Sequence, residues 1–285
     1  MTIAVTFLPR TAPGPLPPIA FIGGGNMASA IIGGLIQQGV AADNFEVVEP
    51  FEEARTRLAQ TYGIVARAEA SEALSRCAVV VWAVKPQTFA EAARPVRAFA
   101  ADALHLSVAA GIPSDSIARW LGTERVVRAM PNTPALVGKG MTGLFARPGV
   151  ESADRARVGQ LLAPTGELIW VDAEPALDAV TALSGSGPAY VFYFIEAMIE
   201  AGVEMGLTPD QAQRLAIGTF TGASALAHSA TEPPSVLRER VTSKGGTTYA
   251  ALSALEAFDV KGQFKTAIRA AQKRAAELGE EFGRG

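Results

Sequence analysis

The sequence IAFIGGGNMA at residues 19–28 joins a short apolar segment to a helical one through three consecutive glycines. The spacing G-x-G-x-x-G/A, met by Gly23, Gly25 and Ala28, is typical of the first turn of a dinucleotide-binding βαβ unit. Gly23 allows the tight turn, and Gly25 lets a pyrophosphate approach the backbone where no Cβ stands in the way. Free N–H groups and the positive dipole end of the following helix favour phosphate there. The stretch therefore predicts a nucleotide site.

The overall composition is that of a folded protein with a large core. The chain has 285 residues, of which 49% are hydrophobic and 19% charged, and its formal net charge is −3. Without a basic cluster, this charge argues against nucleic acid as the main partner. The nearest candidate for a membrane span, residues 190–205, is interrupted by Glu196, Glu200 and Glu204, so we expect none. We expect a soluble protein.

One cysteine and two histidines limit the possible chemistry. Cys77 excludes an internal disulfide framework and is consistent with a reducing cytoplasm, where we place the protein. Cys77 adjoins an apolar run and His105 lies inside one, which favours packed core side chains over catalytic ones. With His228 as the only other histidine, we expect no metal site.

The rest of the chain alternates strands and helices and then becomes helical throughout. Residues 1–17 are proline-rich and lack the basic start and unbroken apolar core of a signal peptide, so we expect an extended lead-in. Runs of strand length occur at residues 45–49, 78–84, 104–109, 125–130 and 168–171. With helices between them, they predict a doubly wound parallel sheet of the Rossmann type over residues 18–171. Residues 172–285 are predicted as an all-helical C-terminal domain.

The end of the second strand bears on the choice of cofactor. Glu49 stands where an acid normally binds the adenosine ribose hydroxyls, which favours NAD over NADP. Arg55 and Arg57 follow closely and could instead bind a 2′-phosphate. Because both arginines could equally lie on a solvated helix face, the choice between NADPH and NADH stays open.

The helical half contains a helix from Pro188 that is apolar except for one stripe of three glutamates. The stripe is most simply a solvated face and not paired acid–base chemistry. A second helix starts at Thr208-Pro209-Asp210-Gln211, a sequence typical of a capped helix start. A soluble helix as apolar as the first must be covered, and the remaining segments are small. We therefore predict an interlocked dimer.

A second glycine loop, VTSKGGTT at residues 241–248, opens another helix. Free amides at such a helix start, with threonine hydroxyls nearby, form an anion site suited to a carboxylate. As a bare pattern, the loop could equally be an ordinary capped helix. Its place in a helical domain downstream of a cofactor domain favours a substrate-binding role.

Five blocks in order, at residues 21–27, 83–87, 128–134, 183–190 and 242–248, resemble pyrroline-5-carboxylate reductase. The resemblance covers nearly everything after the lead-in. It implies the last step of proline biosynthesis, in which NADPH or NADH reduces 1-pyrroline-5-carboxylate to L-proline. It also implies a homodimer formed through the helical domain, often assembled further into a decamer of five dimers, with no nucleic-acid or membrane partner.

The resemblance further implies which residues form the site. It implies cofactor contacts at Ile22, Gly23, Gly24, Gly25, Asn26, Met27, Ala83, Val84, Lys85, Pro86, Val108, Ala109 and Ala110. To these we add Glu49, from its position at the end of the second strand, and Asn132, from the third block. The substrate-binding residues are Val241, Ser243, Gly245, Gly246, Thr247 and Thr248. Lys244 departs from the family, which usually has proline there. Residues 69–71 lack an asparagine that is often present in the family, so that contact is not carried over.

A protonated cyclic imine is already an electrophile, so the reaction needs little acid catalysis. We predict that the amides of Gly246 and Thr247 bind the substrate carboxylate and that the Thr248 hydroxyl, as the catalytic group, orients the ring nitrogen. One alternative is a hydroxyacid or ketoacid dehydrogenase that uses Lys244 as its acid. Another is an NAD(P)-sensing protein without turnover, against which the intact threonine loop argues.

Overall fold

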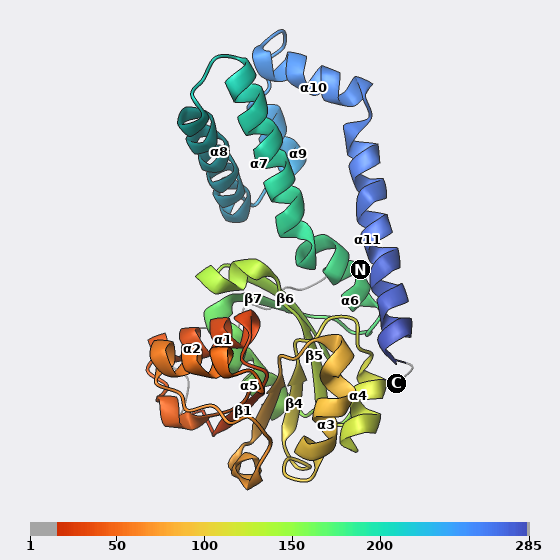
Figure 1. Cartoon of the computed structure of the whole chain (residues 1–285). Coiled ribbons are helices and arrows are strands. Elements are labelled where there is room, and N and C mark those ends of the chain that lie inside the picture. The colour runs from red at the N-terminus through yellow and green to blue at the C-terminus, as the bar shows by residue number, and fades with distance from the viewer. Residues whose placement is uncertain (1–15, 284–285) are drawn as a thin grey trace. The chain divides into compact units, whose positions relative to one another are not determined.

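The computed structural model describes residues 16–283 and consists of two compact units (Figure 1). The first unit contains the chain up to Ser186 and takes it up again from Ala271, and the second contains Gly187–Ala270. The predicted lead-in, residues 1–17, lies almost wholly outside the described residues. Within residues 16–283, no helix combines the length and the apolar character that crossing a membrane requires.

A seven-stranded sheet in the order β2-β1-β3-β4-β5-β6-β7 forms the centre of the first unit. The strands are β1 (Ile19–Ile22), β2 (Phe45–Val48), β3 (Val79–Trp82), β4 (Leu104–Ser107), β5 (Val126–Met130), β6 (Gly140–Ala146) and β7 (Gly166–Trp170). Neighbouring strands are parallel except for β5 and β6, which are antiparallel. The predicted Rossmann-type sheet is confirmed, with one antiparallel pair added.

Strand β6 is the one element of the sheet that the sequence does not predict. Two glycines weaken its strand pattern, and both serve packing. A Cβ at Gly140 would lie 2.7 Å from the carbonyl oxygen of Thr165, and one at Gly143 would lie 2.6 Å from Cγ1 of Val180. The close packing of this strand therefore requires glycine at two positions, and glycine is not typical of strands.

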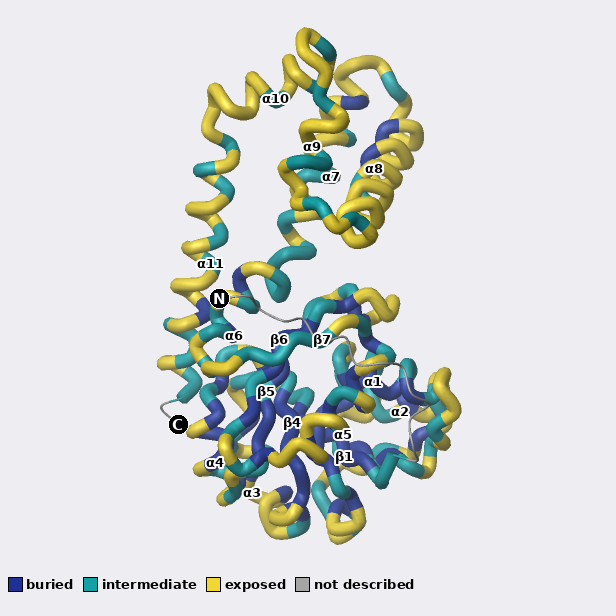
Figure 2. The backbone as a smooth tube through the Cα atoms, turned by 180° about the vertical axis from the view of Figure 1, so that it is seen from behind, coloured by how far each residue is buried: buried dark blue, intermediate teal, exposed yellow. Residues whose placement is uncertain are grey.

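Helices cover both faces of the sheet and enclose two hydrophobic clusters. Helices α1 (Asn26–Gln37), α2 (Glu52–Tyr62) and α5 (Ser152–Leu162) contribute to one, and α3 (Phe89–Arg97) and α4 (Ser114–Leu121) to the other. Successive side chains of a strand point to opposite faces. Ile19 and Phe21 of β1 accordingly belong to the first cluster, and Ala20 and Ile22 to the second. Strands β1, β3 and β4 are buried along their whole length (Figure 2).

The first unit extends beyond β7, past the domain boundary predicted at residue 171, because the following segment still packs on the sheet. Glu174 accepts hydrogen bonds from the Ser114 amide at 2.6 Å and the Ser114 hydroxyl at 2.5 Å, and it pairs with Arg128 of β5. Helix α6 (Ala176–Val180) and a π-helical turn (Thr181–Gly185) follow. The end of α11 (Val260–Gly283) belongs to the same unit, where the Gly283 carbonyl accepts from the Ser116 hydroxyl at 2.9 Å.

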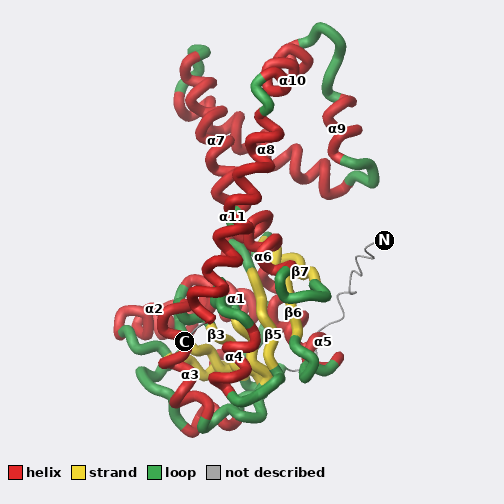
Figure 3. Tube along the Cα trace, turned by 90° about the vertical axis from the view of Figure 1, so that its right-hand side faces the viewer, coloured by secondary structure: helices red, strands yellow, loops and turns green. Residues whose placement is uncertain are grey.

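The second unit is helical throughout, as predicted (Figure 3). It contains α7 (Gly187–Glu204), α8 (Pro209–Ser229), α9 (Pro234–Arg240), α10 (Thr247–Ala257) and the first part of α11. The helix start predicted at Thr208 is confirmed, since Thr208 and Gln211 form a reciprocal capping box. Helices α7 and α8 approach closely at Gly202, where a Cβ would lie 2.9 Å from that of Ala212.

The helices of the second unit leave much apolar surface uncovered. In α7 and α8, only Gly202, Ala212 and Ala216 are buried. Phe192 and Tyr193 of α7 are 58% and 69% exposed, and Leu226 of α8 is 69% exposed. Several large apolar side chains exposed on two neighbouring helices are typical of a surface that associates with another protein. Nothing within Gly187–Ala270 covers it.

His105 is a buried core residue, as its apolar surroundings in the sequence indicate. Its Nδ1 accepts a hydrogen bond from the Trp82 indole at 3.0 Å, and its Nε2 then carries the proton and donates to the Ala100 carbonyl at 3.1 Å. Trp82 also stacks on Phe89. Burial lowers the pKa of His105 from 6.5 to about 4, so the imidazole is neutral in the folded chain.

The buried imidazole predicts a pH-dependent stability. Between pH 6.5 and 4 the unfolded chain binds a proton at His105 that the folded chain does not, so stability falls as the pH is lowered. We expect His105→Gln, whose amide can keep both hydrogen bonds, to remove about 3 kcal/mol of this acid destabilisation. Urea unfolding of both proteins from pH 7 to 4 measures it. Parallel pH profiles for wild type and variant would contradict the prediction.

Candidate active site

The loops predicted to hold a cofactor leave the sheet at a single edge. Hydrogen bonds between neighbouring strands continue past the strand ends: Gly23 donates to the Val48 carbonyl at 2.8 Å, and Ala83 to that of Ile22 at 2.8 Å. Val108 likewise donates to Trp82 at 3.0 Å. The carboxyl ends of β1, β3 and β4, and the loops that follow them, therefore lie side by side. This is the edge at which open α/β sheets bind their ligands.

Each of the three consecutive glycines has a different role. Gly23 has a φ of +95°, and a Cβ there would lie 2.7 Å from the Ala83 carbonyl oxygen, so only glycine fits. The Gly24 amide donates to Oε2 of the buried Glu49 at 2.7 Å. A Cβ at Gly25 would meet nothing within 4 Å. Gly25 thus leaves open space beside the backbone, as the approach of a pyrophosphate requires.

The start of α1 offers unclaimed hydrogen-bond donors. Gly25 is the residue before the helix and provides no side-chain cap. Within residues 16–283, the amides of Gly25, Asn26 and Met27 donate to no acceptor. Backbone donors at a helix N-terminus, reinforced by the helix dipole, suit a phosphate. The residues present therefore fit a dinucleotide at this edge.

The other predicted cofactor residues frame the same edge. Ala83 and Val84 are half-buried, and Lys85 is exposed and precedes a 3₁₀ helix (Pro86–Thr88). Val108 is half-buried, Ala109 buried and Ala110 exposed.

Ser107, which lies outside the predicted site, shapes the turn after β4. The Ser107 hydroxyl is buried and accepts a hydrogen bond from the Ala109 amide at 3.3 Å. In the sequence, the feature that could have indicated this role is a serine at the carboxyl end of a predicted strand.

Asn132, predicted to contact the cofactor, links two loops of the first unit. Its Nδ2 donates to the Ser184 carbonyl at 3.0 Å, and its Oδ1 accepts from the Met141 amide at 2.9 Å. The side chain thereby joins the loop after β5 to the π-helical turn. In this structure its amide group is occupied by the protein's own backbone.

The second glycine loop forms a tight turn in the second unit. The Gly246 amide donates to the Ser243 carbonyl at 3.0 Å, and Gly245, the third residue of the turn, has a φ of +78°. This pattern matches a type II turn, in which proline is common at the second position. Lys244 occupies that position, so the turn lacks the fixed φ that proline would give. The Gly246 amide, predicted to bind substrate, is used within the turn.

Free donors begin one residue later. Helix α10 starts at Thr247 with no side-chain cap, and within residues 16–283 the amides of Thr247 and Thr248 donate to no acceptor. Thr248 is half-buried, while Thr247, Val241, Ser243 and Gly245 are exposed. The loop therefore offers unclaimed backbone donors of the same kind as the start of α1, which would suit an anion.

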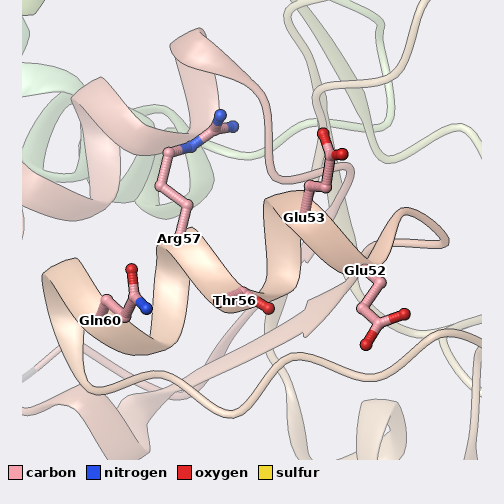
Figure 4. A pocket seen from close by; sticks show the side chains of 5 residues that line it. All are labelled: Glu52, Glu53, Thr56, Arg57 and Gln60. Carbon is pink, nitrogen blue, oxygen red and sulfur yellow. The ribbon is translucent and has the colours of Figure 1, made fainter.

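A surface hollow on α2 includes no residue of either glycine loop. Five side chains line it, all from this one helix: Glu52, Glu53, Thr56, Arg57 and Gln60 (Figure 4). Side chains of a single helix form a surface depression, and two of them are carboxylates. Among residues 16–283, no group of three or more His, Cys, Asp or Glu side chains is placed to hold a metal ion.

The fold and the glycine loop define an oxidoreductase-type dinucleotide-binding unit followed by a helical unit. A family model described as "NADP oxidoreductase coenzyme F420-dependent" matches residues 18–111, and one described as "Pyrroline-5-carboxylate reductase dimerisation" matches residues 174–278. The pyrroline-5-carboxylate reductase of Pseudomonas aeruginosa is 44% identical over 269 residues, covering 94% of this chain and 98% of that protein.

Two solved structures are similar over nearly the whole chain. A pyrroline-5-carboxylate reductase from Coxiella burnetii is 36% identical with a TM-score of 0.86, covering 92% of this chain and 98% of that one. The Plasmodium falciparum pyrroline carboxylate reductase with NADP bound is 28% identical with a TM-score of 0.82 and the same coverage. The chain belongs to the pyrroline-5-carboxylate reductase family.

The glycines of the first loop predict a pair of contrasting variants. Gly23→Ala places a Cβ against the Ala83 backbone in a left-handed conformation, so we expect a loss of at least about 2 kcal/mol of stability. Gly25→Ala meets open space, so its thermal midpoint should stay within a few degrees of wild type. Its methyl group would instead obstruct the pyrophosphate and weaken dinucleotide binding about tenfold or more. Thermal unfolding measures the loss of stability, and calorimetric titration measures the loss of dinucleotide affinity. A Gly23→Ala variant as stable as wild type would contradict the prediction.

Proposed function

We propose that the chain reduces 1-pyrroline-5-carboxylate to L-proline with NADPH or NADH, the final step of proline biosynthesis. The observation that carries the proposal is the pair of anion-binding loops in a chain of this family. One loop lies at the carboxyl edge of a dinucleotide-binding sheet, and the other opens a helix beside two threonines. The first suits a pyrophosphate and the second a small carboxylate.

The dinucleotide is proposed to bind the edge formed by residues 22–27, 83–86 and 108–110. The amides of Gly25, Asn26 and Met27 bind its pyrophosphate, and the loops after β3 and β4 border the reacting end. When bound, NADPH or NADH supplies the hydride that the imine carbon accepts. The chain's own contribution is to hold the ring in place and exclude competing orientations.

The substrate is proposed to bind the loop at residues 241–248. The amides of Thr247 and Thr248 bind the carboxylate, and the Thr248 hydroxyl contacts the ring nitrogen. Because the protonated imine already carries a positive charge, its carbon needs orientation more than further activation. A separation of roughly 3–3.5 Å between the reacting atoms is the geometry that such positioning must achieve.

Thr248 offers the direct test of this site. Thr248→Ala removes the hydroxyl, and we expect kcat/KM for imine reduction to fall about 10- to 100-fold, the effect of one hydrogen bond to a charged group. Thr248→Ser keeps the hydroxyl and serves as the matched control, with activity near wild type. Calorimetric dinucleotide affinity should be unchanged in both. Full activity of Thr248→Ala would contradict the role of its hydroxyl.

Lys244 separates imine reduction from the alternative reduction of ketoacids. As an exposed side chain in a turn, it is not needed to activate an imine, so Lys244→Gln should keep kcat for 1-pyrroline-5-carboxylate within about threefold. A ketoacid dehydrogenase that used Lys244 as its acid would instead turn over ketoacids and lose that activity in the variant.

The uncovered apolar surface of the second unit supports self-association. Exposed Phe192, Tyr193 and Leu226 on α7 and α8 would be covered by a second copy of the same helices. The family match over residues 174–278 carries dimerisation in its description. We propose a homodimer, with a decamer of five dimers as its further assembly, located in the cytoplasm.

A charge placed in this surface predicts loss of the dimer. Phe192→Glu would bury an unpaired carboxylate, so we expect dimer affinity to fall by a hundredfold or more, an effect of about 3 kcal/mol. Phe51→Glu is the matched control, because Phe51 is 72% exposed in the first unit, and its mass in solution should equal wild type. Light scattering over a concentration series measures both. A dimeric Phe192→Glu would place the interface elsewhere.

A further inference from the structure

The end of β2 is the place where a Rossmann-type site distinguishes NADP from NAD. An acid there normally binds the ribose hydroxyls of NAD, whereas an arginine nearby accommodates the 2′-phosphate of NADP. This chain carries both kinds of residue: Glu49 directly follows β2, and Arg55 and Arg57 lie on α2. The contacts that each side chain makes distinguish between them.

Glu49 is committed to the protein's own backbone. Its side chain is buried, its Oε2 accepts from the Gly24 amide at 2.7 Å, and its Oε1 accepts from the Phe51 amide at 3.0 Å. Both carboxylate oxygens thus hold backbone donors, one in the glycine loop and one in the turn after β2. The arrangement makes Glu49 a positioning residue for the two loops.

Arg55 presents its guanidinium at the same strand end. Its Nη1 donates to the carbonyl of Glu49 at 2.9 Å and to that of Pro50 at 2.7 Å, and the side chain is half-buried. These two bonds hold the planar group in place. Within residues 16–283, its Nε and Nη2 donors have no acceptor, so they remain available to a phosphate, which a guanidinium binds with two parallel hydrogen bonds.

Arg57 lacks this setting. Two residues further along a helix, a side chain points about 200° away, so Arg55 and Arg57 lie on different faces of α2. Arg57 is exposed and lines the hollow that it shares with Glu52 and Glu53 (Figure 4). No acceptor within residues 16–283 fixes its guanidinium. The two carboxylates beside it oppose the binding of a phosphate there.

We propose that Arg55 binds the 2′-phosphate of NADP(H) and gives this chain its preference for NADP(H) over NAD(H). Glu49 orders the glycine loop and the turn after β2 and serves both dinucleotides alike. The assignment rests on the proposed dinucleotide site, and it names the residue that distinguishes the two cofactors at that site.

Direct binding tests the assignment without turnover. Calorimetric titration of the full-length protein with NADP⁺, NAD⁺, 2′,5′-ADP and 5′-AMP gives the affinity with and without the 2′-phosphate. We expect wild type to bind NADP⁺ more tightly than NAD⁺, and 2′,5′-ADP more tightly than 5′-AMP. Arg55→Gln should lower the affinity for NADP⁺ and for 2′,5′-ADP about 10- to 100-fold, the range expected for hydrogen bonds to a charged group. The affinities for NAD⁺ and 5′-AMP should stay within threefold of wild type.

Three further variants control for structural effects. Arg57→Gln, on the same helix, should change none of the four affinities by more than twofold. Arg55→Lys keeps the charge and should retain part of the preference for 2′,5′-ADP. Glu49→Gln should lower the affinities for NADP⁺ and NAD⁺ by the same factor, because it disturbs loops that bind both dinucleotides.

Other outcomes would overturn the assignment. Equal affinity of wild type for NADP⁺ and NAD⁺ would overturn it while leaving the proposed function intact. A selective loss of 2′,5′-ADP binding in Arg57→Gln, or a loss confined to NAD⁺ in Glu49→Gln, would overturn the roles of Arg55 and Glu49. Failure of wild type to bind either dinucleotide would overturn the proposed function as well.

Discussion

The dinucleotide-binding edge depends on the close approach of the Gly23 backbone to the carbonyl group of Ala83. With a φ of +95°, the chain turns away from β1 at a point where a Cβ would lie 2.7 Å from that oxygen. The turn lets Gly23 donate to Val48 and Ala83 donate to Ile22, so β1, β2 and β3 end at the same level of the sheet. The unclaimed amides of α1 follow directly. The turn at Gly23 thus fixes the edge, and the helix that supplies its donors begins three residues later.

Elements with local signals could be predicted from the sequence, and elements that depend on distant neighbours could not. The buried run of β3 and the capping box at Thr208 contain their signals within a few residues. Strand β6 does not, because its glycines are explained by Thr165 and Val180, which follow it far along the chain. The same limit applies to the antiparallel direction of β6, which no local pattern indicates.

The candidate site shows the same division more sharply. Its glycines and its position at the carboxyl edge follow from spacing alone, but the partners of its polar side chains do not. Glu49 meets the Gly24 amide only because β2 lies beside β1, and Asn132 meets Ser184 only because the π-helical turn packs near β5. A pattern can locate an acid at the end of a strand, but the hydrogen bonds that occupy it come from tertiary structure.

Both loops present backbone donors by the same means, and this bears on how the proposed reaction responds to pH. In each, a glycine of positive φ, +95° at Gly23 and +78° at Gly245, leads into a helix without a side-chain cap. Among the described residues, the first amides of both helices have no acceptor. Backbone amides do not titrate, so these donors themselves do not change with pH. His105 is buried against Trp82 and serves the core. In the proposed reaction, the positive charge lies on the protonated imine nitrogen of the substrate, which Thr248 needs only to orient.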